Sequence, residues 1–148
     1  MGQGTTVVFN EAMQNISGLI DLSDSSDFKC MLITTLPTAA ALTPDSADFT
    51  EIAAGASYTA GGIALTTTWT EDAGVTTLDT ATSITWAKDP TGATNAMAAL
   101  IYSTTVIGED AVAFIDLSTD GGVTPLSLQT GAITVAVNAS GLFSIAAA

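Results

Sequence analysis

The sequence contains no histidine and no arginine, and its basic residues are Lys29 and Lys88. Without imidazole the chain has no Ser–His or Cys–His pair, no histidine base and no ordinary zinc site. The formal net charge of −13 argues strongly against nucleic-acid binding, because phosphate contacts need Lys or Arg. It argues equally against an anionic membrane surface. We therefore expect no nucleic-acid partner and no membrane partner.

Cysteine and charge of either sign are also scarce. The one cysteine, Cys30, cannot form an internal disulfide, and its apolar setting FKCMLIT predicts a buried small side chain rather than a nucleophile. Charged residues make up 11% of the chain, well under the usual quarter, while Thr, Ser, Ala and Gly are abundant. This mixture favours strands whose outer faces are uncharged and rich in hydroxyl groups.

The chain does have a large apolar fraction, 47% of 148 residues, which is enough to build a core. We expect a single domain over residues 1–148, with residues 1–8 as an extended N-terminal arm. Its expected centre is Ala96–Leu117, where the apolar runs Met97–Ser103 and Ala111–Leu117 flank a turn at Gly108–Asp110. Apolar runs of strand length predict a hairpin that is buried on both faces.

Turn signals recur about every ten residues along most of the chain, with β-rich runs between them. The other strands are expected at Phe28–Thr35, Ile63–Trp69, Val75–Asp79, Ser83–Lys88, Leu126–Leu128, Ala132–Val137 and Leu142–Ile145. Before them, Val7–Ile20 carries apolar residues at spacings of four, three and four, which predicts an amphipathic helix. The expected fold class is mainly β: an antiparallel β-sandwich or barrel-like domain with one N-terminal amphipathic helix.

Two groups of acidic residues are the candidates for chemistry. The first, Asp21, Asp24 and Asp27, has a spacing of three that does not match a calcium loop, and a solvated turn is favoured. The second is the set Glu109, Asp110, Asp116 and Asp120. Glycoside hydrolysis would need two of these carboxyls facing each other across a cleft, which acids near a hairpin tip rarely do. We expect no enzyme, no catalytic residue, no cofactor and no metal site.

The order of short motifs along the chain resembles a family of small virion structural proteins of tailed bacteriophages. The motifs are IDLSDSSDFKCMLIT, SYTAGGIAL, ITWA, AALIY, AFIDL and a last strand preceded by glycine. The resemblance runs from about Phe9 to Ile145. It implies a capsid decoration (cement) protein on the outer capsid surface, bound to the major capsid protein and to copies of itself as a homo-oligomer. It carries over no catalytic residue.

Two segments are the expected partner contacts. The N-terminal arm, with Thr5, Thr6, Val7 and Val8, is suited to add a strand to the sheet edge of a partner. A proline-bracketed loop supplies the second set, Pro37, Leu42 and Pro44. The alternative function is a tail or fibre component that attaches to a host surface, and a glycan hydrolase ranks third.

Overall fold

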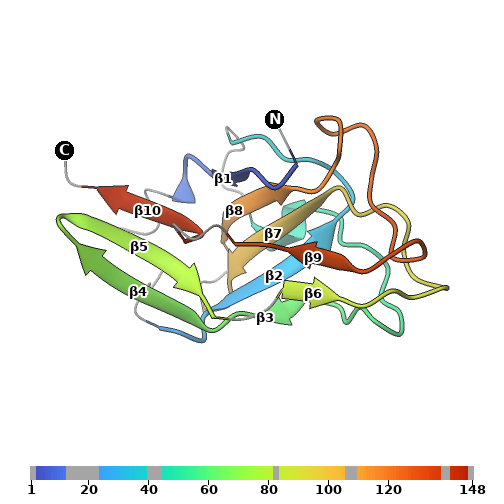
Figure 1. Ribbon diagram of the computed structural model, residues 1–148, viewed down its shortest axis with the longest axis horizontal. Helices are drawn as coiled ribbons and strands as arrows, with labels where there is room; N and C mark the ends of the chain where they lie inside the picture. The colour runs from blue at the N-terminus through green and yellow to red at the C-terminus, as the bar shows by residue number, and fades with distance from the viewer. Residues whose placement is uncertain are drawn as a thin grey trace.

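The computed structural model describes residues 3–12, 24–39, 45–81, 84–105, 110–137 and 141–146. These residues are mainly β, and every pairing between the named strands is antiparallel (Figure 1). The elements in chain order are β1 (Thr6–Val8), β2 (Phe28–Ile33), the 3-10 helix η1 (Ser46–Asp48), β3 (Ile63–Ala64), β4 (Thr67–Asp72), β5 (Val75–Thr80), β6 (Ile84–Trp86), β7 (Ala98–Ser103), β8 (Ala111–Asp116), β9 (Ile133–Val135) and β10 (Phe143–Ala146). The predicted mainly β, antiparallel fold class is confirmed at this level.

The strands β7 and β8 form the centre of a five-stranded sheet with the order β1-β8-β7-β2-β3. All residues of both strands are buried, which explains why their sequences are apolar without alternation. Leu100 lies opposite Phe114, and a register shift follows Ile101. The predicted central hairpin is therefore confirmed in its two strands, whereas Gly108 and Glu109 of its predicted turn lie outside the described residues.

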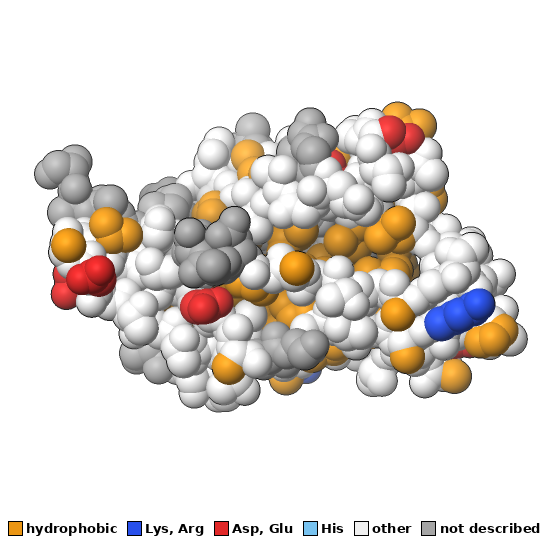
Figure 2. All heavy atoms as spheres, in the orientation of Figure 1, with side chains coloured by type: hydrophobic (Ala, Val, Ile, Leu, Met, Phe, Trp, Pro, Cys, Tyr) orange, Lys and Arg blue, Asp and Glu red, His pale blue; other side chains and the backbone are white. Residues whose placement is uncertain are grey.

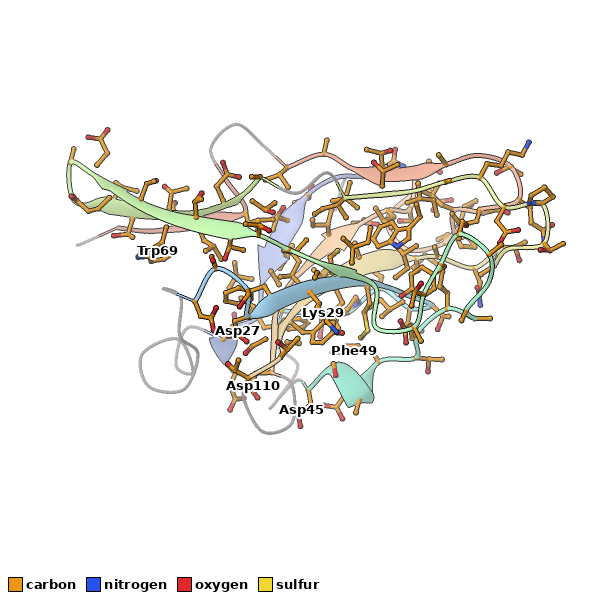
Figure 3. The ribbon with its side chains drawn as sticks, turned by 90° about the horizontal axis from the view of Figure 1, so that it is seen from below. Asp27, Lys29, Asp45, Phe49, Trp69 and Asp110 are labelled. Atoms are coloured by element: carbon orange, nitrogen blue, oxygen red, sulfur yellow. The ribbon has the colours of Figure 1, made fainter. Side chains whose placement is uncertain are left out.

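Both faces of this sheet are covered. In Figures 1 and 3 the two-stranded sheet of β6 and β9 lies over one face, and the segment around η1 lies over the other. β6 and β9 alternate buried and exposed residues, as strands with one inward face do. Trp86 of β6 contacts the buried ring of Tyr58 at a centroid distance of 5.9 Å. On the opposite face the ring of Phe9 lies between Phe49 and Phe114.

A third sheet, with the order β10-β5-β4, extends away from the other two (Figure 1). Its β4–β5 hairpin turns at Ala73 and Gly74, which both have positive φ, 52° and 82°. Two successive positive φ angles define a hairpin turn whose twist matches that of the strands. The predicted strand Ile63–Trp69 is thus wrong in extent: the chain breaks after Ala64, and β4 belongs to this separate sheet.

The predicted helix over Val7–Ile20 is wrong at its start, in the part of its range that the structure describes (residues 7–12). Val7 and Val8 belong to β1, where they pair with Phe114 and Ala113 of β8, and residues 13–20 lie outside the described residues. β-Branched side chains favour this outcome, and the buried strand β8 needs a hydrogen-bonding partner on its outer side. Within the described part of the chain, no helix has the length and apolarity needed to span a membrane.

Candidate interaction surface

The N-terminal segment predicted as an arm is the outermost strand of the chain's own five-stranded sheet. β1 pairs with β8 on one side and has no strand on the other among the residues that the structure describes. Thr5 is exposed, while Thr6, Val7 and Val8 are half-buried. The two valines pack against the core, so this segment is held against the chain's own sheet and is not a free arm.

The outer edge of β1 carries backbone groups that point away from β8. The N–H of Phe9 donates to the carbonyl of Val112 at 3.0 Å, and Thr5 accepts from the N–H of Asp116 at 3.3 Å. Bonding toward a neighbour alternates along an antiparallel strand, so the backbone groups of Thr6 and Val8 face outward. An edge of this kind is a template for strand addition by another chain.

The second expected contact segment meets the first. The N–H of Asn10, just after β1, donates to the carbonyl of Ala39 at 2.9 Å. Figure 1 shows the segment that follows β2 returning to lie beside β1. Pro37 is buried, so its side chain is not a free contact, and Leu42 and Pro44 lie outside the described residues. The structure therefore brings the two segments together at one edge of the sheet.

The face drawn in Figure 2 carries little charge among the described residues. Figure 2 shows a face made largely of uncharged atoms, with a few acidic side chains spread over it and a basic one near one end. Apolar side chains gather in a hollow at the middle of this face, where Figure 1 draws β9 and the central strands behind it. Such a face favours contacts through apolar area and backbone pairing over contacts through charge.

Asp27 corrects the expectation that the first acidic group forms a solvated turn. Its side chain is 1% exposed and accepts hydrogen bonds from the Ser103 hydroxyl and from the N–H groups of Thr104 and Thr105, at 2.8–3.0 Å. The carboxylate therefore ties the start of β2 to the end of β7 (Figure 3). Asp24 lies in a partly exposed turn, as expected, and Asp21 lies outside the described residues.

The second acidic group is not assembled into a carboxylate pair. Asp110 forms an isolated backbone bridge with Asp45 next to the start of β8, and Figure 3 shows the two residues near the same end of β2. Asp116 is buried at the opposite end of β8, and Asp120 is exposed in the loop beyond it. Glu109 lies outside the described residues. This arrangement separates the acids that glycoside hydrolysis would have to bring together.

The reactive side chains of the core are held in their neutral forms. Cys30 is fully buried, as predicted, and burial raises the pKa of its thiol to about 12. Burial also raises the pKa of Tyr58, whose hydroxyl donates to Glu51 at 2.6 Å and accepts from the N–H of Leu32. No group of three or more Cys, Asp or Glu side chains gathers in a metal-binding arrangement within the described ranges.

Comparisons with known proteins add no relative to this description. No protein-family model, no curated protein and no solved structure matches the chain.

Proposed function

We propose that this chain is a structural protein of a tailed-phage virion, a capsid decoration protein on the outer shell that contacts the major capsid protein and copies of itself. The observation that carries the proposal is the outer edge of β1, where the backbone groups of Thr6 and Val8 face outward beside the segment that contains Ala39. An edge that no described strand covers can supply main-chain hydrogen bonds to a partner without requiring charge.

Composition and architecture support the same proposal. A chain of net charge −13 repels packaged DNA, so a place on the outside of the shell suits it better than one inside. The small sheet of β6 and β9 covering the five-stranded sheet supports the β-sandwich interpretation of the fold (Figure 1). The apolar hollow in Figure 2 is a second surface on which attachment can rest.

Copy number in the virion tests this function directly. We expect quantitative mass spectrometry of purified virions to find about one copy per major capsid subunit, or a simple fraction of that, because decoration follows the capsid lattice. A few copies per particle would instead place the chain in the tail or in a fibre. Absence from the virion would reject both structural roles.

Proline substitution at the edge of β1 tests how the chain attaches. Thr6→Pro removes an N–H that faces away from β8, so the fold should survive while strand addition by a partner is blocked. We expect its affinity for capsids that lack the native protein to fall by about 5–150-fold, since one lost hydrogen bond and its unsatisfied partner cost about 1–3 kcal/mol.

Two further variants separate this effect from misfolding. Val7→Pro removes an N–H on the side facing β8, and it should lower the melting temperature. Thr6→Val keeps the outward N–H and the β-branched side chain, and it should bind as the parent does. Full occupancy by a folded Thr6→Pro protein would show that the edge of β1 is not the attachment site.

The tail or fibre alternative has one observation in its favour. The β4–β5 hairpin extends away from the rest of the chain, and most residues of β4 are exposed (Figure 1). A projecting hairpin is a suitable element for contact with a host surface. The copy-number measurement distinguishes this role from decoration, because tail components are present in few copies.

A further inference from the structure

The loop that follows β8 has the residue pattern of the first half of a calcium-binding loop. The sequence from Asp116 to Gly121 is Asp-Leu-Ser-Thr-Asp-Gly, which places oxygen-bearing side chains at positions 1, 3 and 5 and glycine at position 6. Calcium loops use alternate oxygen ligands in this way and need glycine for the sharp turn at position 6. Gly121 has that backbone form, with φ of 73°.

The loop is tightly folded around the carboxylate of Asp116. Oδ1 of Asp116 accepts from the N–H of Ser118 at 2.9 Å and from its hydroxyl at 2.6 Å. The hydroxyl oxygen of Ser118 in turn accepts from the N–H of Gly122 at 2.6 Å. The side chains at positions 1 and 3 therefore already converge, through Oδ1 of Asp116.

The other carboxylate oxygen of Asp116 is the unusual feature. Asp116 is 0% exposed, and Oδ2 is buried without any hydrogen-bond partner among the described residues. A buried carboxylate oxygen without a partner loses several kcal/mol of solvation, so such atoms normally meet a donor or a cation. The pairing partner across the sheet, Ala98, has no side-chain group to offer.

The chain contains two similar turns in which the second carboxylate oxygen of the aspartate reaches solvent or accepts a hydrogen bond. In both, an aspartate accepts through Oδ1 from the N–H and hydroxyl of the residue two positions later. Asp24 of the first turn is partly exposed and reaches solvent. Asp89 of the second is buried, and its Oδ2 accepts from the N–H groups of Ala56 and Ser57. Asp116 alone of the three has a buried oxygen left over.

We propose that the loop from Asp116 to Thr124 binds a calcium ion. Asp116 Oδ2 and the hydroxyl oxygen of Ser118 are the ligands at positions 1 and 3. The Asp120 carboxylate, which accepts from the N–H groups of Val123 and Thr124 and from the Thr124 hydroxyl, supplies position 5 through its remaining lone pairs, and the carbonyl of Gly122 follows at position 7. An all-oxygen site of mixed charge suits a hard divalent cation, and calcium accepts irregular geometry more readily than magnesium does. Asp120 is exposed whereas Asp116 is fully buried, so the site spans the boundary between the loop surface and the core.

The affinity of this site is expected to be low. Position 12, which supplies a bidentate glutamate in high-affinity loops, is Ser127 here. The site then has two carboxylates in place of three or more, and we expect a dissociation constant of about 10⁻⁴–10⁻³ M, as in extracellular modules. The sequence pattern is therefore incomplete at its second half, and the unpaired oxygen of Asp116 carries the assignment.

The ion would stabilise the segment that leads into β1. The N–H of Gly4 donates to the carbonyl of Asp116 at 2.7 Å, and the Gln3 side-chain amide donates to the carbonyl of Leu117 at 2.9 Å. Gly122 lies against the side chain of Leu36, in the segment that precedes Ala39. Calcium binding at the loop is therefore linked to the order of both candidate contact segments.

Calcium titration of the full-length chain tests the proposal. We expect isothermal titration with CaCl₂ in 0.1 M salt to show one saturable site per chain, and the melting temperature to rise with calcium concentration relative to EDTA. Asp120→Asn, an exposed change that leaves the core intact, should weaken binding at least about tenfold, and Asp116→Asn should abolish it. Asp24→Asn, in the similar but solvent-exposed turn, should bind as the parent does.

Three results would overturn the proposal. They are no saturable calcium binding up to 10 times the expected dissociation constant, unchanged binding by the folded Asp120→Asn variant, and an equal loss of binding in Asp24→Asn. The last would show that calcium is held diffusely by the net charge of −13 rather than by this loop. Because Asp120 is exposed, its variant keeps the test valid even if Asp116→Asn fails to fold.

Discussion

Replacing Phe114 with alanine is expected to lower the free energy of unfolding by about 3–5 kcal/mol. Phe114 is fully buried at the middle of β8, opposite Leu100 of β7 and Val7 of β1. Its ring contacts that of Phe9 at a centroid distance of 5.3 Å. Alanine removes this contact and leaves a cavity in the centre of the five-stranded sheet, which close packing on both faces prevents from collapsing.

Urea unfolding monitored by tryptophan fluorescence measures this loss. Leu100→Ala, in the facing position on β7, should lower the same free energy by about 2–5 kcal/mol. Val123→Ala is the control, because Val123 is 75% exposed and its change should stay within about 0.5 kcal/mol. If the Phe114 and Leu100 variants had the same free energy of unfolding as the parent, the β7–β8 hairpin would not be the centre of the fold.

The central hairpin was predictable because its physical signal is strong. Residues in the interior of a covered sheet are buried on both faces, so the two runs around Leu100 and Phe114 are apolar up to their last residues, Ser103 and Asp116. A continuous apolar run of strand length is hard to place elsewhere. The strand at Phe28–Ile33 has the same character and was predicted almost to its ends. What sequence could not supply was the order of strands, which depends on contacts between distant segments.

The error at the N-terminus shows how tertiary pairing overrides local periodicity. The apolar spacing that starts at Phe9 predicts one face of a helix, whereas the ring of Phe9 packs on Phe114 from just after β1. A strand of three residues carries too little alternation to be recognised, and its existence depends on β8 offering an unpaired edge. Similarly, the Leu126–Leu128 strand reduces to a bridge between Leu126 and Ala96.

The burial of three aspartates could not be predicted from the composition of their segments. An acidic residue in a polar stretch predicts a solvated turn, yet Asp27, Asp89 and Asp116 are each no more than 3% exposed. Two of them have Ser or Thr two residues later, which closes a local turn on the carboxylate. The half-exposed Asp24 has the same pattern, so this spacing marks the turn and not the burial. For Asp89, the hydrogen bonds from Thr91 hold its pKa below the ordinary value of 3.8.

Gly62→Ala is expected to lower the free energy of unfolding by about 2–5 kcal/mol, through two effects that add. Gly62 has φ of 73°, a backbone form that alanine adopts at a cost of about 1 kcal/mol. A Cβ there would also overlap the carbonyl oxygen of Cys30 and lie 2.7 Å from Cα of Met31. Both contacts are backbone atoms of β2, so relief requires a shift of the strand next to β7.

Gly74→Ala separates the two effects. Gly74 has φ of 82°, yet a Cβ at that position would have no atom within 4 Å, so only the backbone strain of about 1 kcal/mol remains. Denaturant unfolding of both variants should therefore show a difference of at least about 1 kcal/mol in favour of Gly74→Ala. Equal losses would mean that β3 does not pass closely over β2. The paired glycines in SYTAGGIAL would then be required only by the turn. They would not be required by the close approach of β3 to β2, in which Ile63 pairs with Cys30 at the edge of the sheet.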